Sequence, residues 1–397
     1  MTATSRGGPL VGVRVVELTK VWAGPYVGKL LAYLGAEVIR VESLNSLDVT
    51  RSFGVDDINQ APGFMAVNPQ KLSVQIDMKQ PEGIRLLLDL LAHSDVLVEN
   101  LRPGAVKRLG LGYDVVKAAK PDIVFVSMGM HGSDGPLAYQ TGYAPCFAAL
   151  GGVSLMVGYE DEPPSGMNVR YADSTFGTAA AYAAVVALMH RRRTGEGQFI
   201  DVSAVECMSS MIGDAFMDFA LNDTVAAGVG NRHPQMAPHG VYPCRNSEWI
   251  SIAVNGESAW AALAGLTSLD ADPRFATLAA RKAQESELDM LIAAWTSSRD
   301  AGELMLQLQR HGIAAAKSQS SVDLVADPLL WARGFYRDLQ SNGQSRSTVG
   351  PSWTMDREAR IEDAAPRLGE HNTYVLEEIL GLSTDERRRL DEAGVTR

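Results

Sequence analysis

The alternation of strand-like and helix-like segments near the start of the chain is the feature that most limits how this sequence can fold. Residues 13–18 are rich in β-branched side chains, residues 26–34 have the pattern of a helix, and residues 36–41 are again strand-like. Gly35 ends the helix, because glycine is well suited to follow a helix C-terminus. A strand, a helix and a strand in this order predict a βαβ unit with parallel strands.

The same cycle recurs twice in the first third of the chain. Strand-like residues 72–76 precede a helix that opens at Pro81 and a strand at 96–98. A further helix follows Pro103 and leads to a strand at 123–127. These cycles predict an α/β fold with an open, largely parallel, Rossmann-like sheet. Ligands of such sheets bind at the carboxyl ends of the strands, so we expect the functional site there.

The rest of the chain predicts a second, smaller domain. Residues 129–171 are rich in Gly, Pro and Asp, which indicates loops close to the site, and residues 174–193 form one long Ala-rich helix. The Gly- and Pro-rich stretch 222–243 resembles an interdomain connection. We therefore expect a large α/β domain that begins with residues 1–224, a small α+β domain at 225–335, and a C-terminal segment, 336–397, that returns to the large domain.

Composition and charge disfavour several classes of protein. The 47 acidic and 36 basic side chains give a net charge of −11. The electrostatic field of such a charge repels nucleic acid and anionic membranes. Three scattered cysteines, Cys146, Cys207 and Cys244, are too few for a disulfide framework or a zinc site. The first residues lack a secretory pattern, and the apolar stretch 176–189 is too short to span a bilayer. We therefore expect a cytoplasmic protein.

Several common motifs are nearly present but fail in detail. The stretch 24–29 has one residue too few for a phosphate loop and lacks the Ser or Thr that would follow it. The stretch 108–112 has two glycines of a dinucleotide-binding loop, but the third glycine and a preceding strand are missing. The seven histidines show no metal-ligand spacing, and no GxSxG sequence occurs. We expect no metal, and the sequence disfavours nicotinamide and serine hydrolase chemistry.

Asp173 is the candidate catalytic carboxylate. It lies in the sequence RYADSTFG at 170–177, directly before the predicted Ala-rich helix. The positive end of a helix dipole keeps such a carboxylate ionised, and the free backbone N–H groups there are donors for an oxyanion. An aspartate at this position more often only caps the helix, and spacing alone leaves both interpretations open.

Eight segments, taken together, resemble one known family. They read LTKVWAGP at 18–25, GAEVIRVE at 35–42, PQKLSVQIDMKQPEG at 69–83, DVLVENLRPGAVKRLGLGYD at 95–114, YADSTFG at 171–177, RRRTGEGQFIDVS at 191–203, GNRHPQMAPHGVYPC at 230–244 and LGEHNTYVLEEILGL at 368–382. These segments span nearly the full length of the chain in the family's order. On them the sequence resembles the class III coenzyme A transferase family, the CaiB/BaiF group, which also contains the 2-methylacyl-CoA racemases.

The resemblance implies a covalent mechanism at Asp173. The carboxylate attacks an acyl-CoA thioester to form an aspartyl acyl anhydride, and the released thiolate then forms an aspartyl-CoA thioester. A free carboxylic acid receives the coenzyme A by the reverse of these steps. The implied activity is that of a CoA-transferase whose substrates are an acyl-CoA and a carboxylic acid, with no metal required.

The same resemblance implies where coenzyme A binds, namely across the strand ends of the large domain. Arg40 and Lys71 would meet its phosphates, and Arg108 would add a further cation, because guanidinium and ammonium groups satisfy phosphate oxygens as charged donors. The full set of implied contacts is Lys20, Val21, Trp22, Ala23, Arg40, Lys71, Asn100, Leu101, Arg102 and Arg108.

Tyr143 separates the two activities of the family. In racemase-like members a histidine takes the position of Tyr143 in the segment TGYAP, where it pairs with the aspartate as a second base. A phenol is a far weaker base near neutral pH, so the resemblance favours a transferase in which Tyr143 faces the substrate. The alternatives are a 2-methylacyl-CoA racemase that uses another base and a CoA-binding subunit of a heteromeric transferase.

The resemblance also implies an interlocked dimer in which each chain passes through the other. The long connections near 200–245 and 325–350 flank the predicted small domain and are of the kind that such threading needs. We expect a homodimer or a heterodimer with a paralogous subunit.

Overall fold

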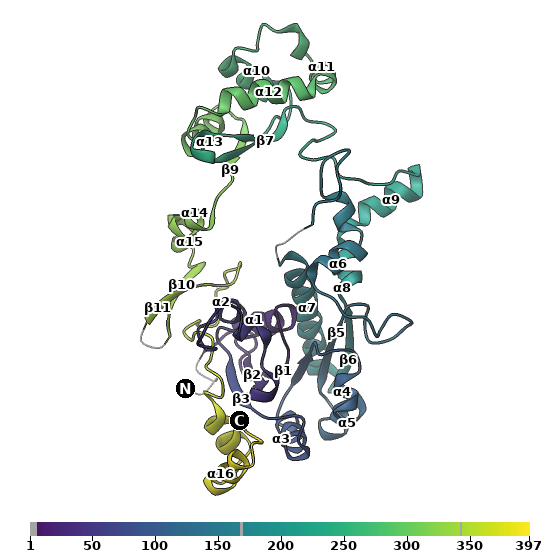
Figure 1. Ribbon diagram of the computed structural model, residues 1–397, viewed down its shortest axis with the longest axis vertical. Coiled ribbons are helices and arrows are strands. Elements are labelled where there is room, and N and C mark those ends of the chain that lie inside the picture. Colours follow the sequence, from purple (N-terminus) through teal and green to yellow (C-terminus); the bar gives the residue numbers. More distant parts are fainter. Residues whose placement is uncertain (1–5, 167–169, 342–343) are drawn as a thin grey trace. The chain divides into compact units, whose positions relative to one another are not determined.

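The computed structural model describes residues 6–166, 170–341 and 344–397 (Figure 1). The chain divides into two compact units, and each has its own hydrophobic core. The first unit comprises Met1–Ser154, Gly166–Asp223 and Pro328–Arg397, and the second comprises Leu155–Ser165 and Thr224–Asp327.

These boundaries differ from the expected ones in two places. The segment Leu155–Ser165 belongs to the second unit, where the Gly158 carbonyl accepts the backbone N–H of Gly230 at 2.8 Å. The chain returns to the first unit at Pro328 rather than at residue 336, because helix α15 (Pro328–Ala332) packs with strand β10 (Tyr336–Ser341). Neither the Gly158–Gly230 hydrogen bond nor the packing of α15 with β10 produces a periodic pattern in the sequence. These two boundaries could therefore not be predicted from it.

The first unit is built on a six-stranded sheet with the order β3-β2-β1-β4-β5-β6, in which every neighbouring pair is parallel. The strands are β1 (Arg14–Leu18), β2 (Glu37–Glu42), β3 (Leu72–Gln75), β4 (Val96–Glu99), β5 (Val124–Gly129) and β6 (Gln198–Ser203). The predicted open, parallel, Rossmann-like sheet is confirmed. The strand order reverses between β1 and β4, and sheets of this class bind ligands at the carboxyl ends of such strands.

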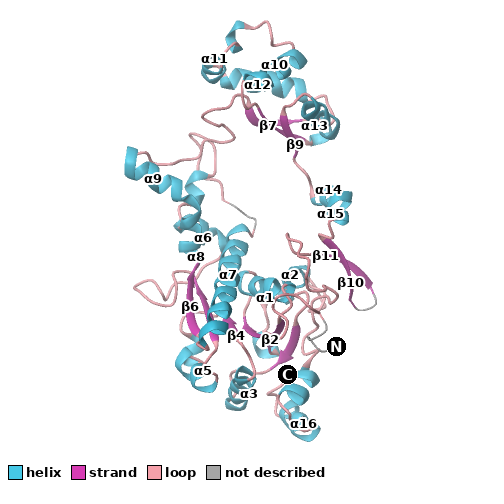
Figure 2. Ribbon diagram, turned by 180° about the vertical axis from the view of Figure 1, so that it is seen from behind, coloured by secondary structure: helices cyan, strands magenta, loops and turns pink. Residues whose placement is uncertain are grey.

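Helices cover both faces of this sheet (Figure 2). Val15 and Val16, neighbours on β1, pack in two different hydrophobic clusters because successive strand side chains point to opposite faces. One cluster includes side chains of α1 (Ala23–Tyr33) and α7 (Tyr171–Thr194), and the other includes those of α3 (Pro81–Ala92). The sheet therefore lies between two helical layers, as a parallel sheet requires.

Helix α7 is the long Ala-rich helix that the sequence predicted. It begins at Tyr171, three residues earlier than expected, and so contains Asp173 in its first turn. It ends before Gly195, whose φ of 78° terminates the helix. By length and composition alone α7 could cross a membrane, but half of its apolar stretch is buried and it packs against α1, β5 and β6. This burial is that of a core helix.

The second unit contains the predicted small α+β domain. Its antiparallel sheet has the order β7-β8-β9, formed by β7 (His239–Pro243), β8 (Trp249–Ala253) and β9 (Ala314–Lys317). The helices are α10 (Glu257–Thr267), α11 (Leu278–Ala283), α12 (Glu285–Thr296), α13 (Ala301–Arg310) and α14 (Ser321–Ala326). Trp260, Phe275 and Ile292 lie in its core.

The remaining elements of the first unit are short. They are α2 (Pro62–Val67), α4 (Ala105–Arg108), α5 (Tyr113–Ala119), α6 (Ala144–Leu150), α8 (Ala204–Ser209), α9 (Gly213–Asn222), β11 (Gln344–Val349), a π-helical segment (Tyr374–Ile379) and α16 (Thr384–Glu392). The C-terminal segment runs along β3, where the side-chain oxygen of Asn372 accepts the N–H of Gln75 at 2.8 Å. This bond ties the end of the chain to its first third.

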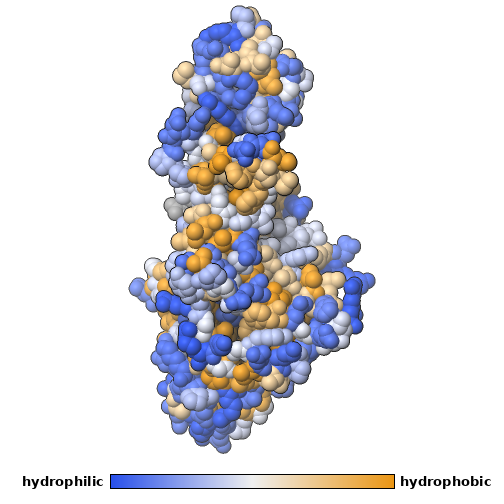
Figure 3. Space-filling view, turned by 90° about the vertical axis from the view of Figure 1, so that its right-hand side faces the viewer, coloured by the Kyte–Doolittle hydropathy of each residue, from blue (hydrophilic) through white to orange (hydrophobic). Residues whose placement is uncertain are grey.

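Large apolar side chains are exposed on two helices of the first unit. On α7, Tyr182, Val186 and Met189 are exposed and share one side of the helix, because they are four and three residues apart. Figure 3, drawn from the side on which α9 lies in Figure 1, shows hydrophobic residues gathered on this face. The exposed residues of α9 are Phe216, Met217, Phe219 and Leu221. We call these seven residues the apolar surface.

Candidate functional site

A cavity of about 830 Å³ opens at the carboxyl end of the parallel sheet, within the first unit. Leu18 at the end of β1, Glu42 at the end of β2 and Met128 near the end of β5 line it. Leu101, in the loop after β4, lines it as well. This is the edge of the sheet at which we expected the site.

The structure brings most of the expected site residues together in this cavity. They come from the loop after β1, the loop after β4, α4, the start of α6 and the first turn of α7. The expected residues that line the cavity are Lys20, Val21, Trp22, Ala23, Asn100, Leu101, Arg102, Arg108, Tyr143 and Asp173.

Arg40 and Lys71 are the two expected residues that the structure does not bring to the cavity. Both side chains are almost fully buried, and neither lines the cavity. The Lys71 ammonium donates to Glu17 Oε1 at 2.8 Å, and the Arg40 guanidinium donates to the same oxygen at 3.1 Å. In this structure both cations neutralise a buried carboxylate, and their expected contact with phosphates stays a prediction.

Burial also acts on the charge of Lys71. It lowers the pKa of the ammonium to about 8, against the opposing attraction of Glu17. Further acceptors satisfy the group, since Lys71 also donates to the Pro25 carbonyl at 2.7 Å and to Asn68 Oδ1 at 2.9 Å. With all its hydrogens directed at protein oxygens, Lys71 has none left for a ligand.

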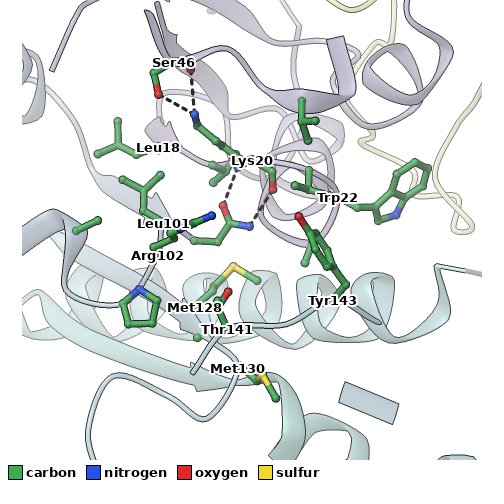
Figure 4. A pocket seen from close by; sticks show the side chains of 18 of the residues that line it. Leu18, Lys20, Trp22, Ser46, Leu101, Arg102, Met128, Met130, Thr141 and Tyr143 are labelled. Atoms are coloured by element: carbon green, nitrogen blue, oxygen red, sulfur yellow. Dashed lines mark hydrogen bonds between the residues drawn. The ribbon is translucent and has the colours of Figure 1, made fainter. Parts of the chain in front are cut away.

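The loop after β1 is fixed to the loop after β4 by a pair of hydrogen bonds (Figure 4). The Asn100 side chain accepts the backbone N–H of Lys20 at 2.7 Å and donates to the Lys20 carbonyl at 2.9 Å. The Lys20 ammonium points away from this loop and donates to Ser46 Oγ at 2.7 Å, and burial lowers its pKa. Asn100 therefore fixes the backbone of Lys20, which forms part of the cavity wall.

Cations line one part of the cavity. Arg102 and Arg108 lie after β4, and Lys79 follows β3. The Arg108 guanidinium donates to the Pro103 carbonyl at 3.1 Å, which holds the side chain against its loop. Lys79 was missed by the sequence analysis, although its position directly after a predicted strand, in the segment PQKLSVQIDMKQPEG, was a usable signal.

Asp173 lies in an environment that disfavours its charge. Burial raises the pKa of the Asp173 carboxyl to about 6, and the nearby Arg170 guanidinium acts in the opposite direction. The next residue, Ser174, accepts a hydrogen bond from the Trp22 indole at 3.3 Å. The start of α7 is thus joined to the loop after β1, and both line the same cavity.

The part of the cavity near Asp173 is mainly apolar. We call this part of the cavity the acyl end. Its residues are Trp22, Met130, Tyr143, Cys146, Phe147, Asp173 and Phe176. Tyr143 precedes α6 and is largely exposed. Figure 4 shows Trp22 and Tyr143 on one side of Lys20, and Leu101 and Arg102 on the other.

No histidine occurs among the described residues that line the cavity. The nearest candidate in the sequence, His131, lies with its Nε2 3.1 Å from Gln140 Oε1 and does not line the cavity itself. Within residues 6–166, 170–341 and 344–397, no group of three or more His, Cys, Asp or Glu side chains is placed to hold a metal ion.

Comparisons with known proteins agree on one family. The model of CoA-transferase family III matches residues 10–372. The chain is 32% identical over 385 residues to a succinyl-CoA--D-citramalate CoA-transferase of Chloroflexus aurantiacus, covering 95% of this chain and 96% of the relative. It is 30% identical over 390 residues to a succinate--glutarate CoA-transferase of Agrobacterium fabrum, covering 94% and 96%. A solved CAIB/BAIF family protein from Brucella suis matches with a TM-score of 0.88 at 31% identity, covering 94% of this chain and 100% of that one.

Proposed function

The chain belongs to CoA-transferase family III, and from this premise we propose that it moves coenzyme A from an acyl-CoA thioester to a free carboxylic acid by covalent catalysis at Asp173. The enzyme class follows from the family, and the covalent route is the proposal. One observation carries it: a partly buried carboxylate in the first turn of α7 faces a cavity at the carboxyl ends of a parallel sheet.

The proposed reaction needs only acyl transfers. An Asp173 oxygen attacks the thioester carbonyl, the C–S bond breaks, and CoA thiolate leaves an aspartyl acyl anhydride. The thiolate then attacks the Asp173 carbonyl carbon, and the donor acid leaves as its carboxylate. The acceptor carboxylate attacks the resulting aspartyl-CoA thioester, and the released thiolate takes the acyl group from the second anhydride. Asp173 returns as a free carboxylate, and no net proton transfer is required.

The environment of Asp173 suits a nucleophile. A carboxylate with a pKa of about 6 is mostly ionised at neutral pH, yet burial leaves it poorly solvated and therefore more reactive. The first-turn N–H groups of α7 have no acceptor within the helix, and they favour negative charge that develops next to them. Asp173 is thus activated by its burial while it is still mostly ionised at neutral pH.

Coenzyme A is proposed to lie along the cavity from its cationic part to the acyl end. The phosphates would meet Lys79, Arg102 and Arg108, since these cations line the cavity. The thioester would then reach Trp22, which lies on the other side of Lys20 (Figure 4), and Asp173, which lines the same cavity. This direction supports attack by Asp173.

The described residues that line the acyl end of the cavity do not favour a racemase, because none of them besides Asp173 is a strong base near neutral pH. Such an enzyme needs a second base facing Asp173 to exchange the α-proton of the thioester. At the acyl end the titratable neighbours are Tyr143 and Cys146, and a phenol is a weak base near neutral pH. Deuterium incorporation at the α-carbon of a 2-methylacyl-CoA, with no acceptor acid present, would contradict the transferase proposal.

Succinyl-CoA is the first donor to test. Two similar proteins are named for transfer from succinyl-CoA to D-citramalate and between succinate and glutarate, and all of these acids are dicarboxylic. We propose a short dicarboxylic acid as donor, acceptor or both. The volume of the cavity is ample for coenzyme A and such an acid.

A partner chain is proposed to cover the apolar surface of α7 and α9. Soluble proteins rarely expose this many large apolar side chains on two helices of one unit, and a dimer interface of usual size would bury them. The partner is a second copy or a paralogous chain. Activity of the purified chain alone would assign the homodimer, and activity only after addition of a paralogue would assign the heteromeric transferase.

A cytoplasmic location is part of the same proposal. Cys146, Cys207 and Cys244 all carry free thiols in the described structure. Cysteines persist in this form in a reducing compartment.

The test of this function is the loss of turnover when Asp173 is changed. Asp173→Ala and Asp173→Asn should fold and bind coenzyme A but lose at least about 1,000-fold in kcat with succinyl-CoA as donor. Asp114→Asn is the matched control, because Asp114 also lies in the first turn of a helix, α5, but is exposed and does not line the cavity. Near wild-type transfer by Asp173→Ala would refute the mechanism.

A further inference from the structure

The Arg170 guanidinium lies over the indole of Trp22, which lines the acyl end of the cavity, while Arg170 itself is not one of the lining residues. Its central carbon lies 4.4 Å from the centre of the Trp22 ring. We propose that Arg170 binds the second carboxylate of a dicarboxylic acyl group while the first carboxylate reacts at Asp173. This inference rests on the proposed transferase function and adds the residue that selects dicarboxylic over monocarboxylic acids.

Arg170 and Asp173 both lie at the start of α7. Arg170 is the N-cap residue, with non-helical backbone angles (φ −77°, ψ 37°), and Asp173 follows three residues later, in the first turn. The charge of Arg170 acts on Asp173 in the structure, since it lowers the pKa of that carboxyl against the effect of burial.

The stacked geometry leaves the hydrogen-bonding groups of Arg170 available. Stacking uses the flat face of the guanidinium, whereas its five N–H groups lie in the plane and point outward. Within the residues that the structure describes, this guanidinium lies against the Trp22 ring, and its charge acts on Asp173. The side chain is exposed, so a ligand in the cavity mouth can reach it. A carboxylate matches such a planar donor pair in bidentate fashion.

The other cations near the cavity are poorly placed for this task. Lys20 donates to Ser46, and Arg102 lies on the far side of Lys20 from Trp22 (Figure 4). The residues that we assign to the acyl end include no Lys or Arg. A second carboxylate buried there without a cation would lose its hydration uncompensated. Arg170 is therefore the residue whose charge makes a dicarboxylic acyl group acceptable.

The experiment is an internal competition between two acceptors of equal chain length. Glutarate and valerate differ in that a carboxylate replaces the terminal methyl group. Both acids compete for the same aspartyl-CoA thioester, so the initial ratio of glutaryl-CoA to valeryl-CoA, measured by mass spectrometry, does not depend on the donor or on the fraction of active enzyme. The ratio therefore reports selectivity alone.

Wild-type protein should favour glutarate, and Arg170→Met should reduce the product ratio by about 10- to 100-fold, as expected for a lost charge-assisted hydrogen bond. Arg170→Lys should fall between the two, because it keeps the charge and loses the planar donor pair. Arg102→Met is the control: it should slow the reaction and leave the ratio unchanged.

The outcomes separate the two proposals. Transfer to both acids with no preference in the wild type, or an unchanged ratio in Arg170→Met, would overturn the role of Arg170 and leave the transferase function standing. Transfer to neither acid from succinyl-CoA or butyryl-CoA would refute the proposed function, and the inference with it. The preference for glutarate is measured on the wild-type protein alone. The proposal can therefore still be refuted if the Arg170→Met protein does not fold.

Discussion

The carboxylate of Asp48 accepts the backbone N–H of Val21 at 3.1 Å and holds that residue at a φ of 69°. A β-branched side chain is seldom found in this left-handed region, and such a conformation costs about 1–3 kcal/mol. Val21 lines the cavity between Lys20 and Trp22. Asp48, which also pairs with Arg40, therefore positions the loop that presents Trp22 to the acyl end.

Removing this support should weaken catalysis. Asp48→Ala should lower kcat/KM by about 10- to 100-fold, because Val21 relaxes from its strained backbone conformation and moves the loop. Asp48→Asn keeps an acceptor oxygen and should retain more activity. Adding Val21→Gly to Asp48→Ala should restore much of the loss, since glycine adopts positive φ without strain. Steady-state kinetics of the four proteins tests this, and failure of the glycine to rescue would indicate a general loss of stability instead.

Glu17 should be a major determinant of stability. Its carboxylate pairs with both Lys71 and Arg40, and all three side chains are buried. Glu17→Ala leaves two buried cations without this partner and should lower the free energy of unfolding by about 3–5 kcal/mol. Denaturant unfolding at one fixed protein concentration measures the change.

The control for Glu17 is an exposed ion pair. Glu82 pairs with Arg389 at 2.8 Å on the surface of the same unit, and water screens this interaction. Glu82→Ala should leave the unfolding midpoint nearly unchanged. Equal effects of the two substitutions would mean that the buried network contributes no more than a surface pair.

The first half-reaction should depend on the ionisation of Asp173. Only the carboxylate attacks the thioester, and its pKa is raised to about 6, so kcat/KM for the acyl-CoA should be constant above this pH and fall tenfold per unit below it. Arg170→Met removes the charge that lowers this pKa, so the falling limb should move to higher pH. Single-turnover release of the donor acid, measured without an acceptor acid, gives the profile. A limb centred below pH 5, or one that moves to lower pH in the variant, would contradict the assignment.

The apolar surface should make the protein an obligate dimer. If the chains are threaded through each other, the free monomer lacks a stable fold and subunits exchange only after unfolding. Light scattering at micromolar concentration should give a dimer, and mixed tagged and untagged chains should stay unmixed under native conditions. A folded monomer or rapid exchange would refute the dimer without affecting Asp173.

The sequence predicted the sheet because parallel strands and their helices leave strong local signals. The strand-like run 13–18 and the helix that ends at Gly35 correspond to β1 and α1 within a few residues. The start of α7 was less well predicted, since Tyr171 and Ala172 carry no helix-start signal of their own. The exact boundary mattered, because it places Asp173 inside the first turn and within reach of Arg170.

Residues of the cavity wall were predictable from the sequence where they follow a strand, whereas the ion pairs of buried cations were not. Trp22 and Arg102 follow strands and line the cavity. Arg40 and Lys71 look like equally good phosphate ligands in the sequence, yet both neutralise Glu17, which lies 54 residues before Lys71. Pairing across such a distance in the chain depends on the fold and cannot be read from local residue patterns.

Trapping of the enzyme-bound intermediate tests the central claim most directly. Wild-type protein incubated with succinyl-CoA and hydroxylamine, then digested and analysed by mass spectrometry, should carry a hydroxamate on Asp173, because hydroxylamine cleaves an aspartyl anhydride or thioester at the aspartyl carbonyl. Asp173→Asn treated in the same way should remain unmodified. A hydroxamate on another residue, or CoA transfer at the wild-type rate with Asp173 never labelled, would contradict covalent catalysis at this carboxylate.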